Sequence, residues 1–219
     1  MDCPGSLAKM NDRVLIWITC RNYERFLSCA LESAHEQTHP CAVYVSHDGC
    51  RGNNPVGTAA NRNRFRDLGY AAHFDWVVFL DADDFLPRNY VEALLEVADT
   101  KDFDVIACDM TQFTDSHIIG KTIVRLPICL ETLLELNTIH CSALIRARTL
   151  PYYDTTLDAF EDWDLWLEMA VAGFRFGYCP STWLFHRLHA DSRHNTKKQN
   201  VNIMRALFQA RYAMELTKC

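Results

Sequence analysis

The sequence lacks the long apolar runs, the excess of positive charge and the targeting segment that would assign it to several large classes of protein. Its longest apolar runs, such as Val14–Cys20, are far too short to span a bilayer. The N-terminus has no charged segment followed by an apolar stretch, so no signal peptide is expected. The formal net charge is −6, which gives no indication of binding to nucleic acid or to an anionic membrane. We therefore expect a soluble, cytoplasmic protein without a transmembrane segment.

Paired cysteine motifs are also missing. The chain of 219 residues contains ten cysteines, but C-x-x-C does not occur. A cysteine zinc site is therefore not expected. Several cysteines lie within apolar runs, where a chain of this size keeps buried free thiols more often than disulfides. We predict a reducing compartment.

The sequence has no internal repeat, no low-complexity segment and no Gly/Ser-rich linker. Hydrophobic residues make up 49%, which is enough for one sizeable core and predicts a single domain over 1–219. Strand and helix patterns alternate in the first half, which favours an α/β fold with a mostly parallel central sheet flanked by helices. The predicted strands there are 14–19, 42–46, 76–81 and 104–108, and the predicted helices are 24–37, 58–68 and 89–97. The second half is less regular, with predicted helices at 130–136, 160–172 and 201–216 and a predicted strand at 140–145.

The most informative segment is the buried strand 76–81, which ends in a group of carboxylates. Asp81, Asp83 and Asp84 follow an uninterrupted apolar run. Ligands of open α/β sheets bind outside the carboxyl ends of the strands. Carboxylates spaced i, i+2 favour Mg²⁺ or Mn²⁺, particularly an ion that carries a phosphorylated ligand. Turn chemistry alone is the alternative explanation, above all for Asp84, because Asp is common in turns.

Two other metal motifs can be tested against the sequence. An EF-hand loop would place Asp81, Asp83 and Glu92 at positions 1, 3 and 12, but Phe85 and Leu86 then occupy positions that need an oxygen ligand and a glycine. An EF-hand loop is therefore not expected.

The segment His35-Glu36-Gln37-Thr38-His39 matches H-E-x-x-H, the zinc protease pattern, which needs both histidines on one continuous helix. Pro40 follows directly, so the helix is expected to end near His39. No third ligand of the usual kind follows either. A protease is therefore not expected.

Other predicted strands also end in polar groups that point to a nucleotide. Thr19 and Asn22 follow the first strand, and Asp48 follows the second. If these strands are neighbours, the groups meet at one edge, where Asp48 would accept a hydrogen bond from the N3–H of a uracil or thymine ring. Arg62 or Arg64 could reach phosphate oxygens, although a solvated helix face is the favoured explanation for each arginine taken singly.

A second acidic cluster opens the helix predicted at 160–172. Asp158, Glu161, Asp162 and Asp164 lie there, where the helix dipole alone would stabilise negative charge. Flanking tryptophans, among them Trp163, would raise the pKa of a carboxylate toward that of a general base and suit the faces of a sugar. Both explanations stay open. The polar stretch at 186–194 is either a surface loop or a lid over a diphosphate, with a histidine completing a metal shell.

Taken in order, these motifs resemble the GT-A glycosyltransferases, in particular the inverting family 2. The resemblance spans about 14–192 and extends, more narrowly, to small glycosyltransferase domains of chlorella viruses that are linked to capsid glycans. The motifs that carry it are Thr19-Cys20-Arg21-Asn22, Ser33-Ala34-His35-Glu36-Gln37-Thr38, His47-Asp48-Gly49, Ala60-Asn61-Arg62-Asn63, the D-x-D of Asp81-Ala82-Asp83, Glu161-Asp162 and Arg187-Leu188-His189-Ala190-Asp191-Ser192.

The resemblance implies an enzyme of the hexosyltransferase type that binds Mn²⁺ or Mg²⁺ and moves a sugar from a nucleoside-diphosphate sugar, UDP-linked by preference, to a glycan or glycoprotein. It implies a GT-A fold in which about 10–110 bind the donor and about 111–219 hold the acceptor and the base. Asp162 would be the catalytic base, and Asp83, with Asp81, would hold the metal. The implied donor contacts are Thr19, Asn22, Asp48, Arg62, Asn63, Asp81, Ala82 and Asp83. The implied acceptor or sugar contacts are Glu161, Trp163 and His189.

Three other functions remain compatible with parts of the pattern. A nucleotidyltransferase or a sugar-nucleotide hydrolase would share the carboxylates at the strand end but would not need Asp162. A non-catalytic nucleotide-sugar-binding module would show no metal-dependent release of nucleoside diphosphate.

Overall fold

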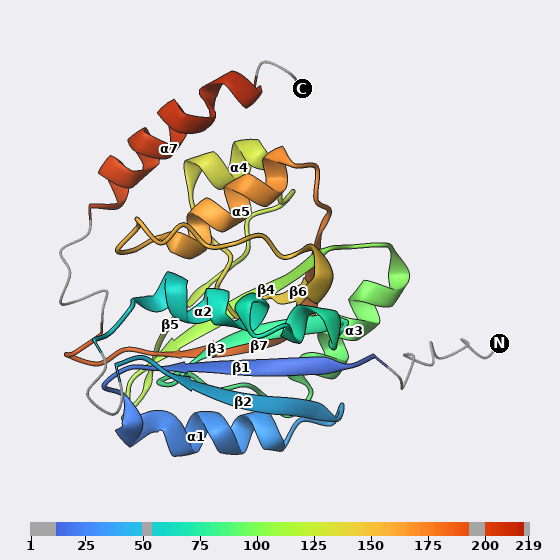
Figure 1. The fold of residues 1–219 in the computed structure, drawn as a ribbon, viewed down its shortest axis with the longest axis vertical. Coiled ribbons are helices and arrows are strands. Elements are labelled where there is room, and N and C mark those ends of the chain that lie inside the picture. The colour runs from blue at the N-terminus through green and yellow to red at the C-terminus, as the bar shows by residue number, and fades with distance from the viewer. Residues whose placement is uncertain (1–11, 50–53, 193–199, 217–219) are drawn as a thin grey trace.

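The protein folds around a single mixed sheet of seven strands with helices on both faces (Figure 1). The computed structural model describes residues 12–49, 54–192 and 200–216. No helix among these residues is both long and apolar enough to cross a membrane.

The first half alternates strands and helices, as the hydrophobic patterns predict. Its elements are β1 (Val14–Cys20), α1 (Glu24–His35), β2 (Cys41–His47), α2 (Thr58–Asp67), a 3₁₀ turn (Tyr70–Ala72), β3 (Trp76–Asp81), α3 (Tyr90–Thr100) and β4 (Val105–Phe113). The second half contains β5 (Ile118–Thr122), α4 (Leu130–Glu135), β6 (Leu144–Arg146), a 3₁₀ turn (Ala147–Thr149), α5 (Glu161–Val171), β7 (Phe176–Arg187) and α7 (Val201–Leu216).

The strand order places the ends of three parallel strands side by side. β1 lies between β2 and β3 and runs parallel to both. β6 pairs antiparallel with β3 and with the start of β4, and β5 pairs antiparallel with the end of β4. β7 pairs parallel with the whole of β4. Five strands (β1, β2, β3, β4 and β7) therefore point the same way, which confirms a mostly parallel sheet.

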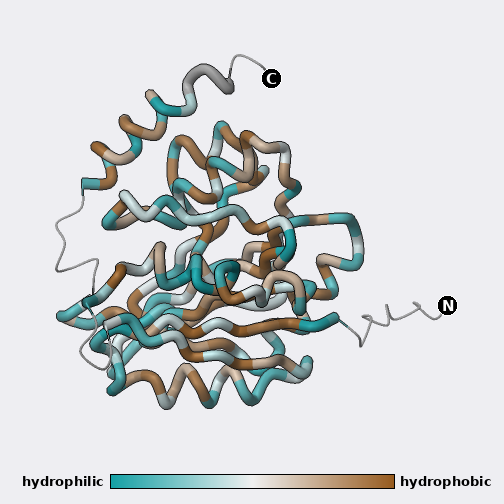
Figure 2. The backbone as a smooth tube through the Cα atoms, in the orientation of Figure 1, coloured by the Kyte–Doolittle hydropathy of each residue, from teal (hydrophilic) through white to brown (hydrophobic). Residues whose placement is uncertain are grey.

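Two apolar cores lie on the two faces of this sheet, because successive strand residues point to opposite sides. Trp17 and Phe79 belong to the core covered by α2, α4, α5 and α7, and Ile18 and Leu80 belong to the core covered by α1 and α3. Both cores include fully buried side chains, which is why β1 and β3 are continuous apolar runs rather than alternating ones. The tube in Figure 2 is accordingly brown along much of the central strands.

The irregular second half departs most from the predicted elements. β5 and β7 are not evident in the sequence, and β4 continues to Phe113. The sequence pattern of β7 is interrupted by three residues, 180–182, that have no partner on β4. Cys108 pairs with Cys179, and the next residue of β4, Asp109, pairs with Trp183. The extra residues include Pro180, which is unusual within a strand. The predicted strand at 140–145 shrinks to β6, so His140 lies in the turn before it.

The structure also accounts for the H-E-x-x-H segment. α1 ends at His35, and His39 lies beyond it with Nε2 2.9 Å from the carbonyl oxygen of Asp12. The two histidines therefore do not share a helix face. Neither belongs to a metal-binding group of His, Cys, Asp or Glu among the described residues.

Two glycines in strands allow the packing of β7 to be tested. A Cβ on Gly177 would come within 2.9 Å of Cδ2 of Phe103, whereas a Cβ on Gly120 in β5 would meet only Oε1 of Gln112 at 3.9 Å. Overpacking costs about 1–3 kcal/mol, so we expect Gly177→Ala to lower the free energy of unfolding by about that amount. Gly120→Ala is the matched control and should change it by about 0.5 kcal/mol or less. Urea denaturation measures both, and equal effects would contradict the close approach of Phe103 to β7.

Candidate active site

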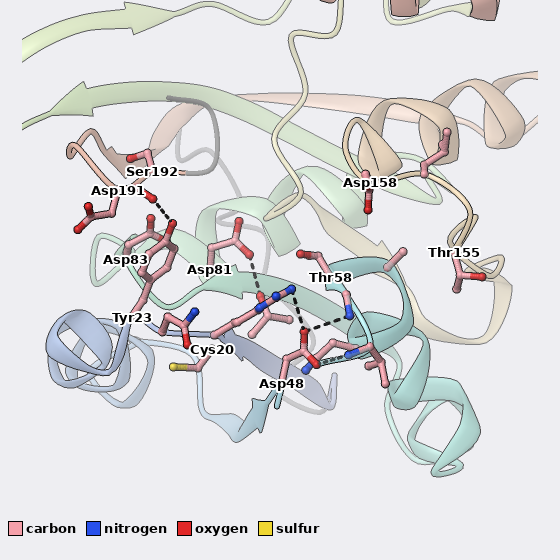
Figure 3. A pocket seen from close by; sticks show the side chains of 18 of the residues that line it. Cys20, Tyr23, Asp48, Thr58, Asp81, Asp83, Thr155, Asp158, Asp191 and Ser192 are labelled. Carbon is pink, nitrogen blue, oxygen red and sulfur yellow. Dashed lines mark hydrogen bonds and ion pairs between the residues drawn. The ribbon is translucent and has the colours of Figure 1, made fainter. Parts of the chain in front are cut away.

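A cavity of about 680 Å³ opens at the carboxyl ends of β1, β2 and β3. Sequence-predicted residues in its lining are Thr19, Asn22, Asp48, Asp81 and Asp83, and Figure 3 shows several of them facing the same space. Among the residues that the structure describes, the lining includes five aspartates, the three just named and Asp158 and Asp191, against Arg21 and His186. Burial lowers the pKa of His186, but the charge of Asp84 and its hydrogen bond raise it more, to about 9. The sheet edge therefore forms a strongly acidic pocket, as predicted for a site that binds a cation.

Asp81 is held by groups from two neighbouring elements. Thr19 is its register partner on β1 and donates its hydroxyl to Oδ1 over 2.7 Å, and Arg62 donates to the same oxygen over 2.9 Å. Burial raises the pKa of Asp81, but the charge of Arg62, that of His140 and these two hydrogen bonds lower it more. The net effect holds the pKa of Asp81 well below its usual range, so this carboxylate stays ionised.

Arg62 connects the two halves of the site from inside the protein. Its side chain is only 2% exposed and pairs with Asp81 on β3 and with Glu161 of α5, at 2.9 and 3.1 Å. The sequence predicts Arg62 as a phosphate ligand and Glu161 as an acceptor contact. Because each is buried against the other, we interpret Arg62 and Glu161 as positioning residues instead.

Asn63, also predicted to contact the nucleotide, is bound to the backbone of a distant loop. Its amide donates to the carbonyl of Tyr153 and accepts from the N–H of Tyr153, at 2.9 and 2.8 Å. Ala82 is likewise fully buried, and its N–H donates to the carbonyl of Thr19. On α2 it is the neighbouring Asn61, rather than Arg62 or Asn63, that lines the cavity.

The turn after β3 is tied to the end of β7. Asp84 is almost fully buried and accepts the backbone N–H of Arg187 at 2.9 Å, while Arg187 Nε donates to the carbonyl of Asp83. His189 Nε2 lies 3.0 Å from Oδ2 of Asp83. Asp84, for which turn chemistry was the alternative explanation, thus also anchors β7 to the site.

Crowded carboxylates shift the pKa of Asp83. Burial, followed by the charges of Asp84 and Asp81, raises it to about 8. Asp83 therefore lies in a cluster of carboxylates whose negative charge His186 and His189 offset only in part. A divalent cation would remove this repulsion, so the residues fit the metal that the sequence predicts.

Asp48 has a structural role in addition to its place in the cavity wall. Its two oxygens accept the N–H groups of Val56 and Gly57 at 2.7 and 3.1 Å, directly before α2. Arg21 approaches the same carboxylate to 3.7 Å. These contacts fix the loop that closes one side of the cavity.

The segment that carries the predicted base enters α5 through a strained residue. Phe160 has a φ of 62°, a left-handed conformation that costs a residue with a bulky side chain free energy. Asp162 follows, half-buried, and its Oδ1 accepts the N–H of Trp163 at 2.8 Å.

Trp163 does not face the cavity. It is completely buried, and its indole N–H donates to the carbonyl of Leu133. The prediction that Trp163 contacts a sugar is therefore wrong, because the helical turn that leaves Asp162 half-exposed directs Trp163 into the core. Asp162 itself is not part of the cavity lining, which is formed on this side by Thr155, Leu157 and Asp158.

Several lining residues were not singled out from the sequence as contacts. They are Gly57, Thr58, Asn61, Thr155 and Leu157, and they come from the start of α2 and the loop before α5. No local motif marks them. They reach the cavity because Asp48 and Asn63 hold these two loops in place.

Comparisons with known proteins agree with this geometry. The family model described as glycosyl transferase family 2 matches residues 49–121, about a third of the chain and the part that contains Asp81–Asp84. None of the curated proteins matches the sequence significantly.

Solved structures share the fold at low sequence identity. One is TarS 1–349 of S. aureus in complex with UDP-GlcNAc, with a TM-score of 0.72 and 15% identity over 93% of this chain and 66% of that one. TarS 1–349 in complex with UDP matches with a TM-score of 0.67 and 14% identity, over 81% of this chain and 61% of that one. The mannosyltransferase PcManGT of Pyrobaculum calidifontis, in complex with GDP-Man and Mn²⁺, matches with a TM-score of 0.51 and 16% identity, over 84% of this chain and 60% of that one. The chain thus spans less than two thirds of the length of these structures. It adopts the GT-A fold of nucleotide-sugar glycosyltransferases.

The buried pairs of Arg62 make a testable contribution to stability. Removing one partner of a buried ion pair costs about 3–5 kcal/mol, because the other charge stays buried without compensation. We expect Arg62→Met to lower the free energy of unfolding by about that amount. The exposed pair of Arg25 and Asp191, 54% and 65% exposed, supplies the control Arg25→Met, which should cost about 1 kcal/mol or less. Urea denaturation distinguishes the two variants, and a small effect of Arg62→Met would contradict its role as a buried link.

Proposed function

We propose that the protein is a metal-dependent, inverting glycosyltransferase that moves a sugar from a nucleoside-diphosphate sugar to an acceptor hydroxyl. The observation that carries this proposal is the acidic cavity at the strand ends of a GT-A fold, in which Asp81 and Asp83 meet. A diphosphate is repelled by five aspartates unless a cation lies between them. The volume of about 680 Å³ lies within the range of about 300–1,000 Å³ typical of small-molecule sites.

Asp83 and His189 are the residues that would hold the ion. Their ligand atoms already face one another at 3.0 Å, and Asp81 lies on the same side of the cavity. Carboxylate oxygens suit Mn²⁺ and Mg²⁺. When bound, the ion would act as a Lewis acid on the departing diphosphate. His189 comes from the R-x-H-x-x-S segment, and its ring is held between Tyr23 and Phe26, with ring centroids 5.0 and 4.8 Å away.

A UDP-linked donor is favoured over other nucleotides. Asp48 lines the far side of the cavity from Asp83 along the sheet edge, where a carboxylate would accept the N3–H of uracil. The similarity to TarS bound to UDP and UDP-GlcNAc supports this preference, and the similarity to a structure bound to GDP-Man leaves guanine as the alternative.

Asp162 is proposed as the base. It would take the proton of the acceptor hydroxyl while the oxygen attacks the anomeric carbon on the face opposite the leaving nucleoside diphosphate, which inverts that centre. Arg62 holds Glu161, the residue before Asp162, and so fixes the start of α5 relative to Asp81. The acceptor is proposed to be a glycan or glycoprotein, a viral capsid glycan being the narrowest form of the hypothesis.

Donor binding can be measured before the acceptor is known. A ligand at about 100 times its Kd stabilises the folded state by about 2.7 kcal/mol, which for a chain of this size raises Tm by about 5–10 °C. We expect UDP with Mn²⁺ to give such a shift and UDP without a divalent ion to give little. Asp83→Asn should abolish the metal-dependent part.

The control is Asp115→Asn, because Asp115 is 80% exposed outside the cavity lining and should leave the shift intact. Equal shifts with and without Mn²⁺, or in Asp83→Asn and the wild type, would refute a metal–diphosphate site.

Asp162 and Asp158 separate the proposed base from a nearby carboxylate. Loss of a general base lowers kcat by about 10²–10⁴-fold, so we expect that decrease in Asp162→Asn, with the Kd for UDP unchanged within about twofold. Asp158→Asn, which alters a lining residue of the loop before α5, should retain kcat within about tenfold. Transfer of labelled sugar from UDP-sugars to saccharide acceptors measures both.

The products distinguish the remaining enzyme classes. Free sugar as the main product in the presence of acceptors would indicate a hydrolase, and pyrophosphate would indicate a nucleotidyltransferase. Donor binding without any turnover would indicate a binding module. Unchanged transfer by Asp162→Asn would remove this residue from the mechanism.

A further inference from the structure

Two histidines and a carboxylate converge next to the cavity without a role in the proposed transfer. Asp84 follows β3, His140 lies in the turn before β6, and His186 is near the end of β7. Their ligand atoms all lie within 4.8 Å of one another. The side chain of Asp84 is fully inaccessible, those of His140 and His186 are 17% and 25% exposed, and His186 lines the cavity. The group is thus enclosed by protein and reachable from the cavity through His186.

The spacing fits the ligands of one ion, although His186 also lies within hydrogen-bond range of Asp84. His140 Nε2 lies 3.5 Å from Oδ2 of Asp84, which exceeds the usual hydrogen-bond range of about 2.7–3.2 Å. His186 Nδ1 lies 3.2 Å from both oxygens of the same carboxylate. Two ligands of a tetrahedral zinc ion, each about 2.0–2.1 Å from the metal, are about 3.3 Å apart. Both histidine–carboxylate separations are close to that value.

The surroundings provide the second layer of contacts that metal ligands need. Nδ1 of His140 accepts the backbone N–H of Ser142 at 3.2 Å and lies 3.2 Å from its hydroxyl. An ion at Nε2 would therefore require the ring proton to move to Nδ1, where the hydroxyl can accept it. Oδ1 of Asp84 accepts the backbone N–H of Arg187, which fixes the carboxylate.

We propose that Asp84, His140 and His186 form a second metal site, selective for a borderline ion of the zinc class. Two imidazole nitrogens and one oxygen favour Zn²⁺ over Mg²⁺, whereas the oxygen-rich site at Asp81 and Asp83 has the opposite preference. The bound ion joins three segments that are far apart in the chain. It thereby fixes the turn that carries Asp83 against the strand end that precedes His189. This inference stands independently of the glycosyl transfer proposed above.

The other metal-binding groups among the described residues contain sulfur, and this makes the site identifiable. They are Cys20 with Glu24 and His47, and Asp81 with His140 and Cys141. X-ray absorption of the wild-type chain loaded with one equivalent of Zn²⁺ should therefore show about two imidazole ligands at about 2.0 Å and no sulfur at about 2.3 Å. A sulfur shell, or scattering from oxygen alone, would overturn the proposal without any mutation.

Variants test the same assignment in solution. The full-length chain, freed of metal with a chelator, is titrated with Zn²⁺ against a chromophoric chelator. We expect one tight site in the wild type and at least a 100-fold loss of affinity in His140→Gln and in His186→Gln. His117→Gln, an exposed histidine on the turn between β4 and β5, is the matched control and should bind as the wild type does.

Asp83→Asn separates the two metal sites, because it should keep the Zn²⁺ site while it loses the Mn²⁺ effect on UDP binding. Absence of tight Zn²⁺ binding in the wild type, or equal binding by His140→Gln, His186→Gln and His117→Gln, would overturn the proposal. If His140→Gln or His186→Gln fails to fold, which circular dichroism reveals, the X-ray absorption spectrum of the wild type still shows whether two imidazoles bind the ion.

Discussion

The buried guanidinium of Arg62 is the interaction on which the rest of the site depends. It is paired at once with Asp81 at the end of β3 and with Glu161 at the start of α5, residues that are 19 and 99 positions away in the chain. Arg62 and Glu161 are almost fully buried, where an unpaired charge is costly, while Asp81 lies at the cavity wall. The arrangement therefore holds β3 and α5 in one relative position. The same contacts fix the half-exposed Asp162, which follows Glu161, and the turn with Asp83, which follows Asp81.

Charge is distributed unevenly around this link. Arg62 compensates Asp81, while burial and then the charges of Asp84 and Asp81 raise the pKa of Asp83 to about 8. Histidines then surround the turn, with His189 next to Asp83 and His140 and His186 next to Asp84. Adjacent aspartates consequently have different partners: Asp83 contacts His189, and Asp84 contacts His140 and His186. Three neighbouring carboxylates can thus serve separate purposes within a single turn.

Local patterns predicted the half of the fold that consists of buried parallel strands. The continuous apolar runs before Thr19 and Asp81 are visible in the sequence, and the D-x-D motif marks the edge at which they meet. β7 escaped prediction because a three-residue irregularity containing Pro180 breaks its pattern. The direction of side chains on helices could not be predicted either. Asn61, Arg62 and Asn63 are consecutive, yet one lines the cavity, one forms buried ion pairs and one binds the backbone of Tyr153. Only tertiary packing determines where each of these side chains lies.

The pairing of β7 with β4 has a consequence for how the protein matures. His186, Arg187 and His189 reach the turn after β3 only when β7 is in register with β4, about a hundred residues after Asp84 has been synthesised. The early strands can therefore pair before these side chains reach the turn. On the metal sites proposed above, binding of an ion would depend on the docking of β7 and not on the assembly of the first half of the sheet.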